Sequence, residues 1–597
     1  MRTRFSLPML LLLAGSGAPS PQTSPWVQDP VRTTTRPSAV ASRPTTASQP
    51  MAASRRTGAP PWHATPTTPG PSGPSTPGPG YSRTHGGAYR GPGDVATGSD
   101  DFFLGGSPGG FPLRDRNAEG STAAFAGLPE VGFVAVEDQP LSTFSVDVDT
   151  ASYAIVRKFL NQGRLPPPGA VRIEDLLNYF RYAYPEAGAG VPFSVTSEMG
   201  ECPWNQEHRL VLFGLRGREI AQRVLPPRNL TFLLDVSGSM TPQDRLPLVQ
   251  SAMRMLVRTL RQQDHVAIVV YAGSSGLVLP PTSGLEQATI EDAITNLRAG
   301  GSTNGGAGIS LAYAVTRQHF DKEGINRVIL ATDGDFNVGV TSNDELVRLI
   351  ERERESGVFL TVLGVGDDNL QDGRMKQLAK NGNGNYAYLD SLQEAHKVLV
   401  REAGATLVTI AKDVKLQIEF NPAKVASYRL IGYENRRLRN RDFNDDKKDA
   451  GEIGAGHTVT ALYEIVPVGA KGSLEVDPLK YQRMPDLTPA ATSSEVLNLK
   501  LRYKEPDGIA SKLLVTPLED RVSASANLRF ASGVAAFGML LLDSAHKGTA
   551  NWSMVGDLVR FDPSAAAPER AELERLVALA AELAAQRARI GAPLRSR

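Results

Sequence analysis

The segment from residue 229 to residue 402 constrains the fold most, because strand-like and helix-like patterns alternate along it. Its strand-like runs are short, rich in β-branched residues and almost free of charge, as in strands covered on both faces: they are residues 229–236, 264–272, 326–333 and 357–365. Between them, apolar residues recur at three- and four-residue spacing in 246–260, 309–320, 344–355 and 391–403. We therefore predict an α/β domain with a doubly wound, Rossmann-like, mostly parallel sheet.

Alternation with a period of two residues lies on both sides of this segment and predicts antiparallel strands. Two such runs precede it and five follow it: 192–199, 208–216, 413–420, 427–434, 457–466, 496–503 and 512–518. Because the ends of a domain usually lie near one another at the surface, the flanking strands can meet in space. We expect a β-rich, sandwich-like domain into which the α/β domain is inserted.

Helical spacing appears at both margins of the β-rich part. Near its start, two helices separated by prolines 166–168 are predicted from Tyr153, Val156, Leu160, Ile173, Leu176, Leu177 and Phe180. Near its end, 526–543 and 568–587 predict further helices, the last with an apolar stripe of Leu573, Leu576, Ala580 and Leu583. That stripe is expected to face the core.

The N-terminal region differs in kind. Residues 1–18 place Arg2 and Arg4 before a short apolar run and then small residues, which is typical of an export signal and too short for a mature transmembrane helix. Residues 21–100 hold 15 of the 43 prolines and no Leu, Ile or Phe. Such a stretch has almost nothing to bury, so we predict a disordered spacer.

The predicted boundaries are 1–18 for the signal, 19–129 for the spacer, 130–228 for an N-terminal flanking domain, 229–402 for the α/β domain, 403–530 for a C-terminal β-rich domain and 531–597 for C-terminal helices. The formal net charge of the 597 residues is only +1, which gives no general attraction to nucleic acid. The single cysteine, Cys202, excludes an intrachain disulfide and a zinc site built from several cysteines.

Oxygen-bearing side chains gather where predicted strands of the α/β domain end. Asp235, Ser237 and Ser239 follow the first strand, Thr303 lies in the Gly-rich loop 300–308, and Asp333 ends a later strand. In open α/β sheets, the carboxyl ends of the strands form the ligand-binding edge. Two carboxylates and three hydroxyls, without imidazole or thiolate, suit a hard cation such as Mg²⁺ or Mn²⁺, and leave a position for a carboxylate from a partner protein.

This pattern resembles the metal-ion-dependent adhesion site (MIDAS) of von Willebrand factor type A (VWA) domains, in which Asp-x-Ser-x-Ser is followed by a lone Thr and then by Thr-Asp-Gly. The flanks resemble those of a bacterial group of exported proteins with a preceding segment and a C-terminal β-rich domain. The resemblance implies a non-catalytic, metal-dependent binding protein in the periplasm, the cell envelope or the extracellular space. The lipid-attachment cysteine of some relatives is absent, so the resemblance gives no membrane tether.

Other interpretations of the same residues stay open. An Asp followed by Ser and Gly at a strand end also serves as a helix cap and turn, and Asp335 and Asn304 either orient a ligand or close a turn. A hydrolase using the same ion would need a general base, and a third alternative is a metal-independent assembly factor. The Gly-rich loop lacks the lysine of a P-loop, no HExxH occurs, and the G-x-S-x-G at Gly105–Gly109 has no strand and helix around it.

Four further features are predicted to be structural. Asp147 and Asp149 alternate with valine, which places both on one solvated strand face in preference to a cation site. The stretch 435–452 contains both basic and acidic residues. We expect it to be a solvated loop and not a binding site for a polyanion. Cys202 is expected to be a small, partly buried hydrophobe. Trp204 is expected in the core, with an exposed anchor as the alternative.

Overall fold

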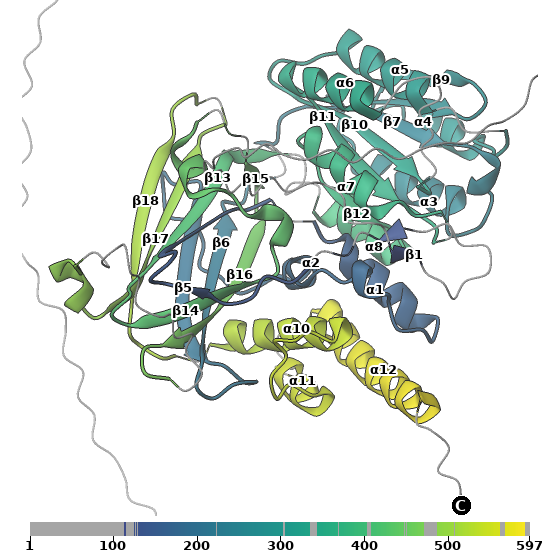
Figure 1. Cartoon of the computed structure of the whole chain (residues 1–597). Helices are drawn as coiled ribbons and strands as arrows, with labels where there is room; N and C mark the ends of the chain where they lie inside the picture. Colours follow the sequence, from purple (N-terminus) through teal and green to yellow (C-terminus); the bar gives the residue numbers. More distant parts are fainter. Residues whose placement is uncertain are drawn as a thin grey trace, which may run out of the picture. The chain divides into compact units, whose positions relative to one another are not determined.

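The computed structural model of the chain describes residues 113–114, 124–125, 127, 129–147, 149–221, 224–301, 305–334, 343–367, 369–402, 408–446, 448, 450–470, 486–506, 508–523, 525–560 and 567–591 (Figure 1). These residues all belong to one compact unit of the chain, Phe102–Arg597. The predicted export signal, nearly all of the predicted spacer and the motif Gly105–Gly109 lie outside the described residues.

The predicted α/β domain contains a six-stranded sheet in the order β12-β11-β10-β7-β8-β9. Its strands are β7 (Arg228–Asp235), β8 (His265–Tyr271), β9 (Ser275–Ser283), β10 (Ile325–Thr332), β11 (Val358–Gly364) and β12 (Tyr386–Tyr388). Neighbouring strands are parallel except β8 and β9, which are antiparallel. The order grows outward from β7 in both directions, so the prediction of a doubly wound, mostly parallel sheet is confirmed.

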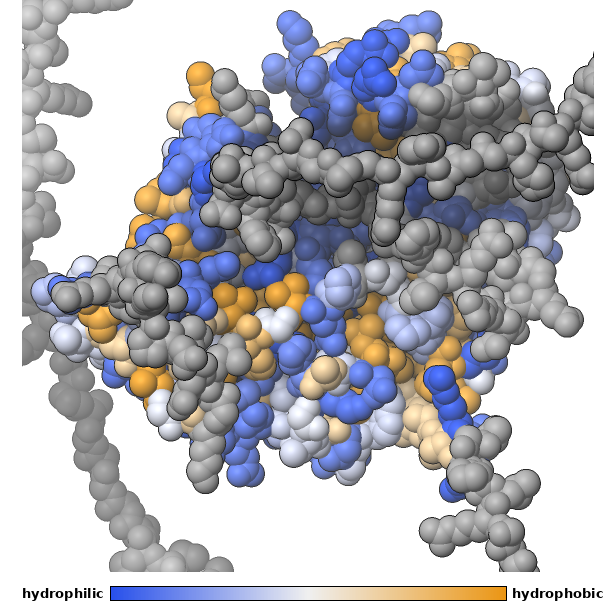
Figure 2. Space-filling model, viewed as in Figure 1, coloured by the Kyte–Doolittle hydropathy of each residue, from blue (hydrophilic) through white to orange (hydrophobic). Residues whose placement is uncertain are grey.

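Helices cover both faces of this sheet. One apolar core joins it to α5 (Gly305–Gln318), α6 (Asn343–Glu355) and α7 (Asp372–Asn381). The other joins it to α3 (Leu246–Val257), α4 (Gln287–Thr295), α8 (Leu392–His396) and the π-helical turn Lys397–Arg401. Hydrophilic residues gather over the outer side of α6 in the view of Figure 2, in keeping with the charged end of that helix.

Two antiparallel sheets form the host domain. The first has the order β3-β14-β16-β6-β5, and the second has the order β15-β13-β17-β18, with β4 also paired to β13. Their strands are β3 (Val134–Ala135), β4 (Leu141–Ser145), β5 (Phe193–Glu201), β6 (Arg209–Gly217), β13 (Thr409–Phe420), β14 (Val425–Ile431), β15 (Gly451–Gly454), β16 (Thr458–Pro467), β17 (Glu495–Lys504) and β18 (Lys512–Glu519).

Both sheets contain strands from before and after the α/β domain, and they share one apolar core. The pairing of β6 with β16 joins residues about 250 positions apart in eight register pairs, such as Leu212 with Leu462. The expected insertion of the α/β domain into a β sandwich is therefore confirmed.

A layer of helices covers the outer face of the first sheet. It consists of α1 (Ala151–Asn161), α2 (Ile173–Asn178), α10 (Ala526–Leu542), α11 (Trp552–Val559) and α12 (Pro568–Gly591). Leu573, Leu576 and Ala580 are buried in this layer and Leu583 packs against it, as the apolar stripe predicts. Within the described residues, none of the helices combines the length and the apolar character that a membrane crossing requires.

The folded part extends into the predicted spacer. β1 (Leu113–Arg114) pairs with β2 (Ala124–Phe125), and the Phe125 ring is buried with its centroid 6.1 Å from that of Phe159 on α1. Phe125 supplies apolar surface of the kind that residues 21–100 lack, and burying it offsets the cost of ordering the chain around it. Placing the end of the spacer at residue 129 was therefore too late in the chain.

The prediction of a solvated face for Asp147 and Asp149 is wrong. β4 ends at Ser145, so neither residue lies in a strand, and Asp149 is buried. Its carboxylate lies 3.0 Å from Arg436 and 3.3 Å from Lys376, and it accepts a hydrogen bond from the backbone N–H of Tyr386. Burial alone would raise the pKa of Asp149, but these cations and the hydrogen bond hold that pKa below its usual value.

The stretch 435–452 is not a wholly solvated loop either. Two 3₁₀ turns, Glu434–Arg436 and Asn440–Asn444, shape it, and Arg436 and Phe443 are buried. Arg436 is buried because its guanidinium pairs with both Asp147 and Asp149. The mixture of positive and negative residues in this stretch does not predict the burial of Arg436, because the acids that pair with it lie almost 290 residues earlier.

Cys202 and Trp204 both lie in the core of the helical layer. Cys202 is more deeply buried than expected, and burial raises the pKa of its thiol far above its usual value. Trp204 is also fully buried and donates its indole N–H to Glu464 at 3.2 Å. The alternative of Trp204 as an exposed anchor is therefore wrong.

Candidate functional site

Asp235 is the last residue of β7 and is completely buried. β7 lies between β8 and β10, and Asp235 is opposite Tyr271 in the parallel register while Leu234 is opposite Ala331. Parallel strands end at the same edge, so Asp235, Tyr271 and Thr332 lie side by side. Each of the latter two hydroxyls donates to Oδ2 of Asp235 at 3.2 Å.

Ser237 and Ser239 follow in the turn after β7. The backbone N–H of Ser237 donates to Oδ1 of Asp235 at 2.9 Å, and the two serine hydroxyls lie 3.0 Å apart. A 3₁₀ turn, Gly238–Met240, holds both serines close to the strand end. The spacing Asp-x-Ser-x-Ser thus brings one carboxylate and two hydroxyls together within a single tight turn.

The Gly-rich loop is hydrogen-bonded to this turn. The N–H of Gly300 donates to the carbonyl of Val236 at 2.7 Å, and the N–H of Gly238 donates to the carbonyl of Gly301 at 3.0 Å. Thr303 and Asn304 lie outside the described residues, and α5 resumes at Gly305. A side chain at position 308 would meet Cβ of Tyr271 at 2.8 Å, so glycine there lets α5 begin against the sheet edge.

Asp333 follows β10 and is buried like Asp235. Its Oδ2 accepts a hydrogen bond at 2.7 Å from Nη1 of Arg245, which also donates to the backbone carbonyl of Ser239 at 2.8 Å. Sequence reasoning missed Arg245, because a single arginine in the connection before α3 belongs to no motif that we recognised. Asp335 lies outside the described residues.

Burial shapes the electrostatics of this edge. It raises the pKa of Asp235, and the negative charge of Asp333 adds to the rise, while the hydrogen bonds from Ser237 and Tyr271 oppose it. The pKa of Tyr271 is also raised, first by burial and then by the charge of Asp235, so its hydroxyl keeps its proton and donates. Both shifts follow first from burial and then from the negative charge of a neighbouring carboxylate.

The donor set fits a divalent cation. No arginine, lysine or histidine among the described residues forms an ion pair with Asp235, although its carboxylate is completely buried. Carboxylate and hydroxyl oxygens are the ligands of Mg²⁺ and Mn²⁺, which accept waters in the remaining positions. Among the described residues, no three His, Cys, Asp or Glu side chains group as a metal site, so a site at this edge depends on its hydroxyls.

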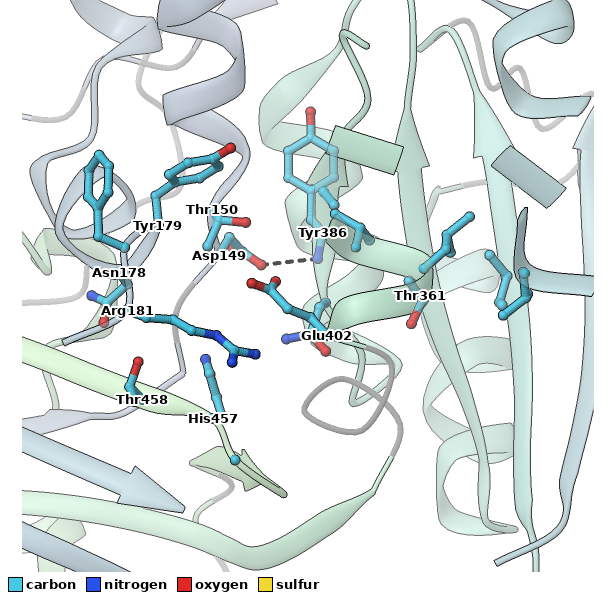
Figure 3. A pocket seen from close by; sticks show the side chains of 18 of the residues that line it. Asp149, Thr150, Asn178, Tyr179, Arg181, Thr361, Tyr386, Glu402, His457 and Thr458 are labelled. Atoms are coloured by element: carbon cyan, nitrogen blue, oxygen red, sulfur yellow. Dashed lines mark hydrogen bonds between the residues drawn. The ribbon is translucent and has the colours of Figure 1, made fainter. Parts of the chain in front are cut away.

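A separate cavity of about 80 Å³ lies where the α/β domain contacts the host domain. In Figure 3, the side chains of Arg181, Glu402 and His457 point toward one another on one side of it. Burial, with the charges of Arg181 and Lys397, lowers the pKa of His457 to about 4, so its ring is neutral at neutral pH. This cavity shares no lining residue with the edge that holds Asp235 and Asp333.

Three protein families match the chain. The family described as von Willebrand factor type A domain matches residues 229–401, the one described as von Willebrand factor matches residues 119–212, and the one described as Uncharacterized protein YfbK, C-terminal, matches residues 405–583.

Individual proteins and solved structures are also similar to the chain. Uncharacterized protein YfbK of Escherichia coli (strain K12) is 45% identical over 458 residues, covering 74% of this chain and 79% of the relative. A solved structure, von Willebrand factor type A from Catenulispora acidiphila, aligns over 67% of this chain and 91% of its own, with 15% identity and a TM-score of 0.37. BatB from Bacteroides thetaiotaomicron aligns over 29% of this chain and 96% of its own, with 23% identity and a TM-score of 0.26.

The match to YfbK spans most of both chains, and the matched family regions cover the inserted domain as well as its two flanks. The chain therefore belongs to the YfbK family of proteins, in which a VWA domain lies between an N-terminal flanking region and a C-terminal domain.

Proposed function

We propose that this protein is an exported binding protein that captures a carboxylate of a partner protein through a bound Mg²⁺, or Mn²⁺, ion. The proposed ligands are Asp235, Ser237, Ser239, Thr303 and Asp333. The observation that carries the proposal is the buried carboxylate of Asp235, which lacks a cationic partner in the described part of the chain and lies beside two hydroxyls at the ligand-binding edge of the sheet.

Each proposed ligand has a distinct part. Asp235 and Asp333 supply the negative charge, and the three hydroxyls supply neutral oxygen. When bound, the ion acts as a Lewis acid that accepts one further oxygen ligand from outside. Because the three hydroxyls are neutral ligands, the ion keeps much of its Lewis acidity and favours the carboxylate of a partner's Asp or Glu side chain. Tyr271 and Thr332 hold the Asp235 carboxylate in place by donating to its Oδ2.

The proposal is one of binding and not of catalysis. VWA domains typically mediate protein binding, and among the described residues beside Asp235 we identify no general base for a hydrolytic reaction. The proposal of export depends on residues 1–18, whose pattern is typical of a signal segment. Export implies that the protein lies in the periplasm, the cell envelope or the extracellular space. N-terminal sequencing of the mature protein checks this: an intact Met1 in the purified native protein would exclude cleavage.

Titration calorimetry with Mg²⁺ and Mn²⁺ tests the metal site. We expect saturable binding to the wild type and loss of binding in both Asp235→Asn and Asp235→Ala. The Asn variant keeps the shape and one hydrogen-bond acceptor, so it separates loss of the ligand charge from misfolding. Asp292→Ala, which removes an exposed carboxylate on α4, is the matched control and should bind as the wild type does. Equal binding by wild type and Asp235→Asn would refute the site.

Crosslinking in the envelope tests the partner. We expect a protein partner to be crosslinked to the wild type in Mg²⁺ and lost in excess chelator or in Asp235→Asn. A partner retained in chelator and by the variant would favour the metal-independent assembly factor. Turnover of ester or phosphoester substrates that is lost in the same variant would favour a hydrolase.

A further inference from the structure

Arg327 is a buried cation that forms no ion pair with any residue that the structure describes. It lies in β10, and only 2% of its surface is exposed. Its Nη1 donates to the hydroxyl of Thr361 at 2.7 Å, and its guanidinium lies over the Phe359 ring at 5.6 Å. No carboxylate among the described residues pairs with it, and its Nε has no hydrogen-bond partner.

Such an arrangement is costly unless something compensates it. A buried charge left unpaired loses its hydration without gaining an ion pair. Burial lowers the pKa of Arg327 to about 10, with the charge of Glu452 opposing the shift, so the guanidinium remains charged at neutral pH. Neutralisation by deprotonation is therefore unavailable, and an anion from outside would supply the missing charge.

Arg327 lines a groove of about 680 Å³ between the α/β domain and the host domain. Seven cationic side chains and four anionic side chains line this groove, an excess of three positive charges. Asn385 and His457 line both the groove and the smaller cavity of Figure 3. Thr361, which accepts the hydrogen bond from Arg327, lies on the side of the smaller cavity.

Most of the charges in the groove already have a structural role. Arg436 pairs with Asp147, and the carboxylate of Glu452 accepts hydrogen bonds from Asn383 and Thr409. Arg354 and Lys380 lie in the last turns of α6 and α7, where a cation offsets the negative end of the helix dipole.

Four cations remain. Arg327, Arg437, Arg439 and Lys448 form no ion pair in the part of the chain that the structure describes, and the last three are exposed. Among the described residues, Glu351 also forms no ion pair, and its negative charge opposes these cations. One buried arginine and three exposed cations therefore line the same groove without an ion pair to any described residue.

We propose that this groove binds a small oxyanion carrying two or more negative charges, with Arg327 at its buried end and Arg437, Arg439 and Lys448 at its open end. Arginine presents several N–H donors that match phosphate and carboxylate oxygens, and a charge-assisted hydrogen bond to a buried guanidinium is among the stronger polar contacts. The site is independent of the metal site, because the two share no residue.

Calorimetry on the full chain tests the proposal, with inorganic phosphate and citrate as separate probes and chloride at matched ionic strength as the reference. We expect the wild type to bind at least one of the two probes, and Arg327→Met to weaken that binding by at least about tenfold. Phosphate binding alone would assign a phosphate group, and citrate binding alone would assign a carboxylate. Arg348→Met, which removes an exposed arginine on α6 outside the groove, should bind as the wild type does.

Thermal unfolding gives a second readout. In chloride, Arg327→Met should unfold at the same temperature as the wild type or higher, because it removes an uncompensated buried charge. The bound probe should raise the unfolding temperature of the wild type and not of the variant. If Arg327→Met does not fold, the affinity of Arg437→Gln for the probe tests the proposal instead. Arg437 is exposed, so its replacement leaves the core intact.

The proposal fails if neither probe binds the wild type. It also fails if Arg327→Met, or Arg437→Gln where the first variant is unfolded, binds with unchanged affinity. Ordered water would then be sufficient to satisfy the guanidinium of Arg327.

Discussion

Arg245 places a positive charge directly against a proposed metal ligand. Its Nη1 lies 2.7 Å from Oδ2 of Asp333, and both side chains are buried. The arginine satisfies the carboxylate when no other cation is near, and it repels a divalent cation that approaches the same carboxylate. At the scale of single residues, we therefore expect Arg245 to set the affinity of the proposed site for a metal ion.

Replacing Arg245 by glutamine should therefore tighten Mg²⁺ binding. Two positive centres about 5 Å apart at an effective dielectric near 20 repel by several kcal/mol, so we expect an affinity gain of about tenfold or more in calorimetry. Without metal, the variant should unfold at a lower temperature, because the buried carboxylate of Asp333 loses its ion pair with Arg245.

Arg258→Gln provides the control for this change, since the Arg258 side chain is 72% exposed and its pair with Glu291 spans 3.9 Å. This variant should leave both Mg²⁺ affinity and unfolding unchanged. Weaker Mg²⁺ binding by Arg245→Gln would mean that Arg245 serves mainly to orient Asp333, and would contradict the repulsion argued here.

The contrast between Asp235 and Asp149 shows which residues a sequence can place. Asp235 ends a run of buried strand residues, and the sheet rule puts it at the binding edge without further knowledge. Asp149 follows a strand that ends four residues earlier, and its cations, Lys376 and Arg436, come from segments more than 200 residues away. Local periodicity determines the first position, whereas only long-range packing determines the second.

At the scale of elements, the same distinction holds. Four strands of the α/β domain, β7, β8, β10 and β11, were predictable because each is a nearly uncharged apolar run. β9 and β12 were missed for physical reasons: β9 contains Pro280 and Pro281, which an edge strand tolerates, and β12 has only three residues. α4 and α7 were missed because they are short and present few apolar residues.

β12 depends on a close approach between its backbone and that of β11. The periodicity of the sequence does not predict this contact either. Gly384 precedes this strand, and a Cβ atom built there would overlap the carbonyl oxygen of Leu360 in β11. We therefore expect Gly384→Ala to lower the free energy of unfolding by about 1–3 kcal/mol, because backbone atoms of two paired strands must move apart.

Urea denaturation measures this change. Gly276→Ala is the matched control, because a Cβ atom at position 276 meets nothing within 4 Å. It should leave the urea midpoint within the range of ordinary surface substitutions, about 0.5 kcal/mol. Equal midpoints for the two variants would show that β11 and β12 accommodate the methyl group, and would contradict the tight approach.

At the scale of the whole molecule, buried ion pairs join the inserted domain to its host. Arg172, just before α2, forms two hydrogen bonds with Asp372 of α7 at 2.7 and 2.8 Å. Arg157 of α1 pairs with Asp390 at 2.5 Å and with Glu394 at 2.8 Å. Such pairs add little net stability but penalise every arrangement that breaks them. They make the VWA domain a fixed part of the molecule, and they were not predictable from either domain alone.

His457 makes this junction sensitive to acid. Its ring is neutral in the folded chain because burial and the charges of Arg181 and Lys397 lower its pKa from 6.5 to about 4, while Glu402 lies across the same cavity. Above about pH 6.5 the ring is neutral in the folded and in the unfolded chain. Between about pH 6.5 and 4 only the unfolded chain takes up the proton, so the free energy of unfolding falls as the pH is lowered through that window.

Replacing His457 by glutamine removes this proton from both states. We expect the stability of the wild type, relative to His457→Gln, to fall by about 1.4 kcal/mol for each pH unit within that window, and to stay constant above it. Chemical denaturation from pH 8 to pH 4 measures the difference between the two curves, in which the contributions of the carboxylates cancel. His396→Gln, at an exposed position on α8, should run parallel to the wild type. If His457→Gln also runs parallel, then the ring takes up its proton without cost in the folded chain, and the junction contains no acid-sensitive histidine.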